Sequence, residues 1–232
     1  MGKNREMKKG APLQEVLKKI YDRLFTTFGP QGWWPASSPF EVAIGAILTQ
    51  NTNWTNVEKA INNLKKHNLL SPQKLKEIDE KKLSTYIKSA GYYNQKSKKI
   101  KEFVKFLIEN YGGKMERMKG EDPEKLREKL LSIKGIGRES ADSILLYALN
   151  LPVFVVDAYT YRIMLRHGLI YEDITYDELK EIFEKNLPQD VKIFNEYHAL
   201  LVKVGKEFCK KSVPKCDGCP LEEFLGNKND DG

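Results

Sequence analysis

The feature that most constrains the fold lies in residues 131–142, where Gly135 and Gly137 stand on either side of a single isoleucine. Residues 124–131 before the turn and 138–149 after it carry apolar side chains at the spacing of one helix face. Glycine permits positive φ and lets another backbone come close. The stretch therefore predicts two helices joined by a very tight turn.

The start of the second predicted helix has the chemistry of a phosphate site. The first N–H groups of a helix have no partner within it and carry a partial positive charge. Lys134 and Arg138 add full charges beside them, and the formal charge of the whole chain is +7. One interpretation is a helix-hairpin-helix that grips a nucleic-acid backbone without reading its sequence. The other is an ordinary helical hairpin with a glycine cap.

Length and composition limit the classes of protein that this chain can belong to. Its 232 residues are enough for one large or two modest domains with a proper core. No run approaches the roughly 18 apolar residues that a membrane helix needs, so we expect no membrane partner and a cytoplasmic location. The three cysteines all lie within residues 209–219, which is not a disulfide framework distributed through the chain.

Helical periodicity runs through the chain, and no stretch alternates apolar and polar residues for long enough to predict a sheet. Residues 40–49 are nearly all apolar and should form a buried helix, with Pro35 and Pro39 marking a loop before it. We expect an all-α fold with helices over residues 13–28, 40–49, 53–66, 71–78, 80–88, 97–111, 124–131, 138–149, 158–167, 176–186 and 191–208.

Five motifs, taken in order, resemble the endonuclease III branch of the helix-hairpin-helix DNA glycosylase superfamily. They are Leu-Thr-Gln-Asn-Thr at residues 48–52, Gly-Tyr-Tyr-Asn-Gln-Lys-Ser-Lys at 91–98, the hairpin at 134–142, Val-Val-Asp at 155–157, and the spacing Cys-x6-Cys-x2-Cys from Cys209. No single motif is decisive, but the ordered set is highly specific and spans most of the chain.

The resemblance implies two helical domains with a central cleft for DNA and a flipped base. Residues 39–150 would form a central domain, with the helix-hairpin-helix at about 123–149. Residues 1–38 and 151–232 would form the second domain, including a cysteine-containing loop at 209–219. The implied partner is double-stranded DNA with a flipped damaged base, bound by a monomer associated with the nucleoid.

The DNA contacts that the resemblance implies come from one glutamine and the hairpin. Gln50 resembles the family's wedge, which fills the gap left by the extruded nucleotide. Its alternative role is that of a polar residue at the end of a helix. The hairpin residues expected to contact DNA are Lys134, Gly135, Ile136, Gly137 and Arg138.

A closer resemblance is to the 3-methyladenine DNA glycosylase III subfamily, carried by Trp33-Trp34-Pro35 and by residues 135–142 and 157–161. Trp33, Trp34, Pro35 and Trp54 match pocket-lining positions of the subfamily. They lie in two loops that the fold of the subfamily brings to one cleft. An alkylated purine such as 3-methyladenine is cationic, and electron-rich rings attract a cation. The alternative is that the tryptophans pack between domains.

Two polar residues complete the implied pocket. In this family the aspartate that follows the hairpin is the catalytic carboxylate, and Asp157 occupies that position. A buried anion would stabilise the positive charge that builds on the sugar, and can also orient or deprotonate the attacking water. Its alternative role is to cap the helix over 158–167, and both roles can hold together. Lys206 matches a lysine beside the pocket that some members carbamylate, or is a plain surface lysine.

One departure from the family pattern bears on the reaction. Bifunctional relatives carry a lysine two residues after the second glycine of the hairpin, and its amine forms a Schiff base with the sugar. Glu139 stands at that position and cannot form an imine. Lys134 or Lys96 can supply a stray amine, but nothing in the sequence recommends either. The resemblance therefore implies a monofunctional enzyme that leaves an abasic site.

The cysteines leave three alternatives open. Cys209, Cys216 and Cys219 match three of the four iron–sulfur ligands of endonuclease III, while Leu225 stands where the fourth would be. The loop can hold an iron–sulfur cluster, incomplete or with an external ligand or an oxygen of Glu222 or Glu223. It can also bind zinc with His198, or carry no metal. No cofactor is required for the chemistry.

We therefore predict a base-excision DNA glycosylase that hydrolyses the N-glycosidic bond of alkylated purines such as 3-methyladenine. One alternative is an endonuclease III-like glycosylase for oxidised pyrimidines or mismatched thymine. The other is a non-catalytic helix-hairpin-helix module that only binds DNA.

Overall fold

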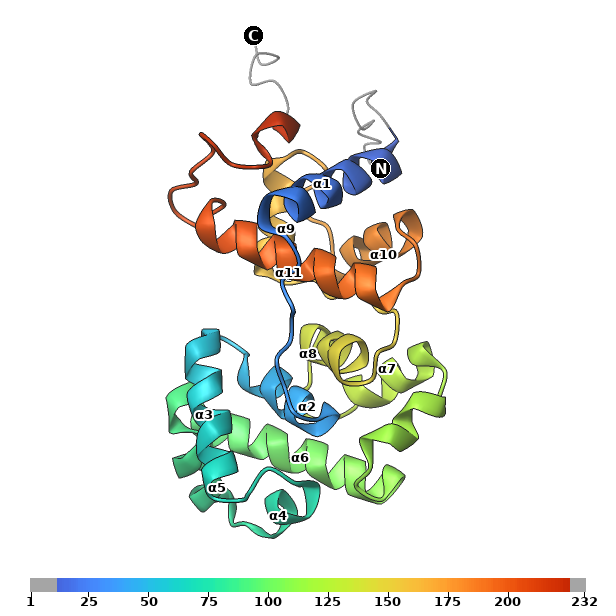
Figure 1. Ribbon diagram of the computed structural model, residues 1–232. Helices are drawn as coiled ribbons and strands as arrows, with labels where there is room; N and C mark the ends of the chain where they lie inside the picture. The colour runs from blue at the N-terminus through green and yellow to red at the C-terminus, as the bar shows by residue number, and fades with distance from the viewer. Residues whose placement is uncertain (1–11, 226–232) are drawn as a thin grey trace. The chain divides into compact units, whose positions relative to one another are not determined.

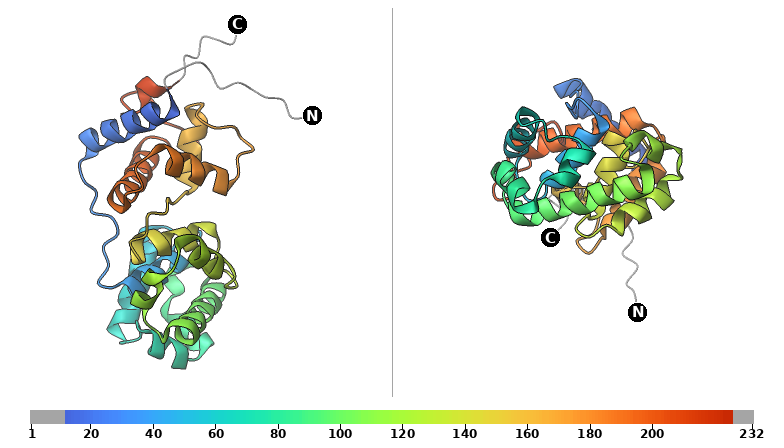
Figure 2. Two further views of the ribbon diagram at one scale, coloured as in Figure 1. Left: turned by 90° about the vertical axis from the view of Figure 1, so that its right-hand side faces the viewer. Right: turned by 90° about the horizontal axis from the view of Figure 1, so that it is seen from below.

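The computed structural model describes residues 12–225, and its regular elements are helices (Figure 1, Figure 2). No strand forms among the described residues, as the all-α prediction requires. The helices form two compact units. Among the described residues, the terminal unit holds residues 12–31, Val156–Gln189 and residues 196–225, and the central unit holds Gly32–Val155 and Asp190–Asn195.

The central unit is built around a buried helix, α2. The Ser38 side chain accepts a hydrogen bond from the Glu41 N–H, and Pro39 opens the helix. Every residue from Phe40 to Leu48 is buried, as the apolar run predicts, and α2 packs against α3, α6, α8 and η3. The elements of this unit are α2 (Pro39–Leu48), α3 (Trp54–Lys66), α4 (Pro72–Glu77), α5 (Glu80–Tyr86), η1 (Lys88–Ala90), α6 (Tyr93–Tyr111), η2 (Met115–Gly120), α7 (Pro123–Leu131), α8 (Arg138–Ser143) and η3 (Ile144–Ala148).

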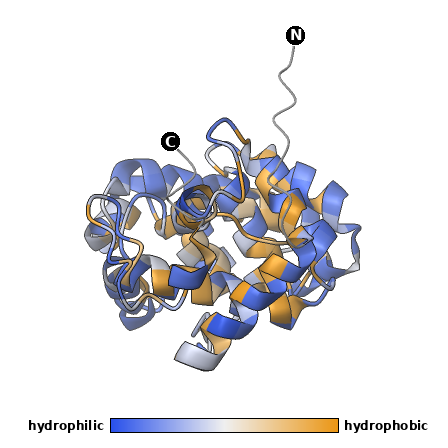
Figure 3. Cartoon of the chain, turned by 90° about the horizontal axis from the view of Figure 1, so that it is seen from above, coloured by the Kyte–Doolittle hydropathy of each residue, from blue (hydrophilic) through white to orange (hydrophobic). Residues whose placement is uncertain are grey.

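The terminal unit joins the first long helix to the last third of the chain. Helix α1 buries Leu17, Ile20 and Leu24, which recur at helical spacing, and the Tyr197 hydroxyl donates to the Leu17 carbonyl at 2.8 Å. Figure 3 shows hydrophilic and hydrophobic residues alternating along the helices. The elements are α1 (Leu13–Phe28), α9 (Ala158–Arg166), α10 (Tyr176–Asn186), α11 (Val191–Glu207, of which residues 191–195 group with the central unit) and η4 (Glu222–Phe224).

Three local predictions were wrong. Helix α6 begins at Tyr93, four residues before the expected start at residue 97, because the Tyr92 carbonyl already accepts from Gln95 and Lys96. Trp54 is the first residue of α3 and does not lie in a loop, because the Asn53 side chain caps the helix there. The second hairpin helix is α-helical only to Ser143 and continues as a π-helical turn, η3.

Candidate active site and nucleic-acid interface

The turn between α7 and α8 has the tight geometry that the two glycines predict. Gly135 lies at φ +91°, and Gly137 is the N-cap of α8 with no side-chain hydrogen bond to the helix. Lys134 and Arg138 are exposed on either side of the turn. The Ile136 side chain is 5% exposed, so it anchors the turn from inside and does not lie on the surface. The outer surface of the turn is therefore backbone flanked by two cations.

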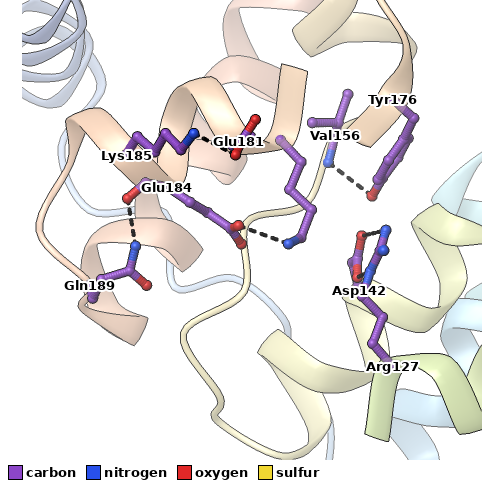
Figure 4. Close-up of polar contacts among 9 residues, drawn as sticks. Arg127, Asp142, Val156, Tyr176, Glu181, Glu184, Lys185 and Gln189 are labelled. Carbon is purple, nitrogen blue, oxygen red and sulfur yellow. Dashed lines mark hydrogen bonds and ion pairs between the residues drawn. The ribbon is translucent and has the colours of Figure 1, made fainter. Parts of the chain in front are cut away.

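A buried ion pair braces the two hairpin helices. Arg127 on α7 donates from Nε to Asp142 Oδ1 at 2.6 Å and from Nη2 to Oδ2 at 3.1 Å (Figure 4). Asp142 on α8 is fully buried, and the Arg127 side chain is 12% exposed. Such a two-point contact fixes orientation as well as distance. The pair was not predicted. Asp142 lies beside an apolar run, and this could have indicated it, because a buried charge needs a partner.

Gln50 rests on the hairpin. Its amide Nε2 donates to Ser140 Oγ at 2.9 Å and to the Gly135 carbonyl at 3.3 Å, and the Lys99 ammonium donates to its Oε1. A Cβ on Gly135 would lie 2.5 Å from Cγ of Lys99, so only glycine allows this approach. The structure thus brings the predicted wedge residue together with the predicted phosphate-binding turn.

A buried lysine fastens the segment that carries Gln50. Lys96 on α6 is 1% exposed and donates to the Leu48 carbonyl at 2.9 Å and to the Ala90 carbonyl at 2.7 Å. Burial, aided by the charge of Lys99, lowers the pKa of Lys96 to about 8. An amine with such a pKa is a potential nucleophile, but both carbonyl contacts hold it inside the central unit.

The three tryptophans of the chain form one aromatic cluster in the central unit. Ring centroids lie 6.3 Å apart for Trp33 and Trp34, 6.5 Å for Trp33 and Trp54, and 5.0 Å for Trp34 and Trp54. Tyr147 on η3 extends the cluster, with its ring 5.1 Å from that of Trp34. Each indole is only partly buried, and Pro35 beside them is exposed. The sequence grouped the tryptophans but missed Tyr147, which is hidden in an apolar run.

Asp157 stands at the start of α9 in the terminal unit. Its Oδ1 accepts from the Thr160 N–H at 2.8 Å and from the Thr160 hydroxyl at 3.0 Å, so it caps the helix. Its Oδ2 faces Nε2 of His198 on α11 at 3.6 Å. Burial raises the pKa of Asp157, but His198 and the Thr160 hydrogen bonds lower it by more, so the pKa lies below its ordinary value. The Asp157 side chain is 12% exposed, and its carboxylate is held in place by contacts to both oxygens.

The end of α11 lies against α9 in the same unit. A Cβ on Gly205 would lie 2.4 Å from Cδ1 of Tyr159, so only glycine lets the two helices come this close. Lys206, the next residue, is exposed in the last turn of α11. Lys206 and His198 therefore both belong to α11, the helix that packs closely against α9 at Gly205.

The cysteine loop is held by two arginines of α9. Arg162 Nε donates to the Cys209 carbonyl at 2.8 Å, and Arg166 donates to the Cys209 Sγ at 3.3 Å. Arg166 also donates to the carbonyls of Lys210 and Lys211, at 2.7 and 2.9 Å. Neither arginine was singled out in the sequence. Together these hydrogen bonds attach the start of the loop to α9.

Cys209, Cys216 and Cys219 line one cavity of about 30 Å³, together with His167 and Leu225. Burial raises the pKa of Cys219, which disfavours the thiolate that a metal requires. Leu225, at the position of the family's fourth ligand, is an apolar wall of the cavity. These residues do not fit a four-thiolate cluster.

The other ligands that the sequence offered are used elsewhere. His198 faces Asp157 and is not part of the cavity lining, and Glu223 forms an ion pair with Arg23 at 2.5 Å. Glu222 lines the cavity but accepts from the Gly218 N–H at 3.1 Å. Within residues 12–225, no group of three or more His, Cys, Asp and Glu side chains is arranged to hold a metal ion.

Comparison with known proteins identifies the family. Residues 44–189 match the model of the HhH-GPD superfamily base excision DNA repair protein. A protein of Methanocaldococcus jannaschii named as a candidate DNA repair glycosylase is 54% identical over 215 residues, 92% of this chain and 97% of the relative. Endonuclease III of Thermotoga maritima is 33% identical over 186 residues, 80% of this chain and 82% of the relative. The chain belongs to the HhH-GPD superfamily, as the ordered motifs predict.

Solved structures share the fold. The H. pylori 3-methyladenine DNA glycosylase bound to 1,N6-ethenoadenine matches with a TM-score of 0.71 and 31% identity, over 84% of this chain and 97% of that one. An endonuclease III–DNA complex matches with a TM-score of 0.78 and 22% identity, over 91% of this chain and 94% of that one, which is a likeness of fold. None of the described helices is both long and apolar enough to cross a membrane.

Proposed function

We propose that the protein is a monofunctional DNA glycosylase that hydrolyses the N-glycosidic bond of alkylated purines such as 3-methyladenine in duplex DNA. The observation that carries the proposal is the cluster of Trp33, Trp34 and Trp54, whose partly buried indoles lie with Tyr147 in one unit. The likeness to the H. pylori glycosylase with its bound ethenoadenine supports the choice of substrate class.

The tryptophan cluster suits a cationic base better than a neutral one. A ring face attracts a cation through its quadrupole, and the attraction grows when water is excluded. A purine alkylated at N3 carries a positive charge in the substrate and leaves as a neutral base. We infer that Trp33 and Trp34 stack on the flipped base and that Trp54 and Tyr147 hold Trp34 in place.

Asp157 supplies the charge that the reaction needs. As the N-glycosidic bond breaks, its electron pair leaves with the purine and the sugar becomes positive. A fixed carboxylate stabilises that sugar cation, and water then adds to the anomeric carbon with loss of a proton. The two hydrogen bonds from Thr160 hold one oxygen of Asp157, so the carboxylate need not reorganise during the reaction. No cofactor takes part in these steps.

The amines near the hairpin support the proposal that the enzyme does not cleave the strand. Glu139 lies on the exposed surface of α8, at the position of the nucleophilic lysine in bifunctional relatives. Lys96 has a lowered pKa but donates to two carbonyls inside the central unit. Lys134 is exposed on the turn, where we assign it to the DNA backbone with Gly135, Gly137 and Arg138. Duplex DNA is bound by a monomer, with Gln50 filling the gap of the flipped nucleotide.

Base release from defined duplexes tests the proposal. We expect 3-methyladenine to leave methylated duplex DNA, and borohydride to trap no covalent adduct of protein and DNA. Release of an oxidised pyrimidine with a trapped adduct would indicate an endonuclease III-like enzyme, and release of thymine opposite guanine would indicate a mismatch glycosylase. DNA binding with no base released from any duplex would identify a non-catalytic module.

A further inference from the structure

The two oxygens of Asp157 have different surroundings. Both short contacts, from the N–H and the hydroxyl of Thr160, go to Oδ1. The other oxygen, Oδ2, faces His198, whose Nε2 lies 3.6 Å away. His198 comes from α11, 41 positions further along the chain, and is only 5% exposed. The acid and the imidazole are thus brought together by tertiary packing, with the imidazole buried and the acid partly exposed.

The chemistry of a carboxylate decides which nitrogen of the imidazole carries a proton. An ionised carboxylate has no hydrogen to donate and only accepts. An Nε2 without a hydrogen would direct a lone pair at Oδ2, and the contact would be repulsive. The pair is therefore stable only with a hydrogen on Nε2, in either the neutral or the charged imidazole.

We propose that His198 is a positioning residue for Asp157: its Nε2–H points toward Oδ2 and holds the carboxylate in one orientation. This rests on the proposed function, because His198 would act through the carboxylate that we assign to catalysis. At 3.6 Å the contact is longer than a hydrogen bond. Oδ2 is thus oriented by the imidazole yet retains capacity to accept a proton from the attacking water, while His198 keeps its own proton throughout.

The balance of effects on Asp157 supports this role. Burial alone would raise the pKa of Asp157, because it disfavours the charged form. The groups that oppose burial are His198, from α11, and the N–H and hydroxyl of Thr160, from the first turn of α9. The Thr160 contacts reach only Oδ1, which leaves His198 as the group that acts on Oδ2.

Three variants test the role of His198 on methylated duplex under single-turnover conditions. His198→Leu keeps the bulk and removes the N–H, and we expect base release to slow by about a hundredfold, the effect of misplacing a reacting group by roughly 1 Å. Loss of His198 should raise the pKa of Asp157. As the pH is lowered, the variant should therefore lose activity at a higher pH than the wild type does. His198→Gln restores an N–H donor and should recover most of the rate. His67→Leu, at an exposed histidine of the central unit, should match the wild type.

A readout independent of activity separates this inference from the proposed function. Long-range proton–nitrogen NMR of the labelled wild-type imidazoles reports which nitrogen of His198 is protonated, and we expect Nε2. If the wild type released no base, the proposed function would fail. The NMR result would still show whether Nε2 of His198 carries a hydrogen toward Asp157. A proton only on Nδ1 would overturn the inference, as would a His198→Leu enzyme with the wild-type rate and pH profile. Should His198→Leu not fold, a His198→Gln enzyme as slow as Asp157→Asn would overturn it as well.

Discussion

Replacing Asp157 with asparagine is expected to lower the single-turnover rate of base release by about a thousandfold, the scale on which one electrostatic contact to a transition state acts. The reason is the loss of charge, since asparagine has almost the same shape and caps helices as well as aspartate does. The Thr160 hydrogen bonds to Oδ1 can persist, so α9 should begin at the same residue. The rate is measured with enzyme in excess over methylated duplex, and the affinity for the same duplex by fluorescence anisotropy.

Asp79→Asn is the matched control for this prediction. Asp79 also caps a helix through its side chain, which accepts from the Lys82 N–H at 3.1 Å at the start of α5. The Asp79→Asn enzyme should keep the wild-type rate. Both Asp79→Asn and Asp157→Asn should keep the wild-type affinity for DNA. An Asp157→Asn enzyme as fast as the Asp79→Asn enzyme would reduce Asp157 to a helix cap. Equal loss of rate and of DNA binding would mean that Asp157 supports the fold.

Replacing Arg127 with methionine is expected to lower the free energy of unfolding by about 3–5 kcal/mol, because it leaves the charge of Asp142 buried without this partner. The hairpin would lose its brace, and we expect weaker DNA binding by the same variant even at temperatures where it is folded. Chemical denaturation gives the free energy, and anisotropy with undamaged duplex gives the affinity.

Two further variants show whether charge is the cause. Arg127→Met combined with Asp142→Leu removes both charges, and it should recover much of the lost stability because apolar side chains can replace a buried pair. Lys74→Met breaks an ion pair with Glu77 in which both side chains are more than half exposed, and it should leave stability nearly unchanged. A double variant no more stable than Arg127→Met would show that packing at Arg127, and not the pair, stabilises the hairpin.

Local rules were enough to predict most of the helices. Residues 40–48 are apolar at every position but one, so a buried helix was the expected result, and Ser38 and Pro39 mark its start. Helix α10 agrees with its predicted bounds because Thr175 and Glu178 form a capping box. The turn at Gly135 followed from glycine alone. In each case the signal lies within a few residues of the feature.

Contacts between distant segments were beyond the sequence. His198 was considered only as a zinc ligand, yet the packing of α11 against α9 turns it toward Asp157. The sequence could not reveal that Gln50 would rest on the hairpin through Ser140, because 90 positions separate them. The spacing of the cysteines suggested a cluster, whereas the lining of their cavity also includes Arg166 of α9 and Leu225, which lie elsewhere in the sequence. Such features follow from tertiary packing, which periodicity and capping rules do not describe.

A crystal structure of the protein with a duplex carrying a non-hydrolysable analogue of an alkylated purine nucleotide is the most direct test of the account. We predict that the base stacks on Trp33 and Trp34, while an oxygen of Asp157 lies within roughly 3.5 Å of the anomeric carbon of the same nucleotide. A base bound away from the tryptophans, or an Asp157 carboxylate that does not face that sugar, would contradict it.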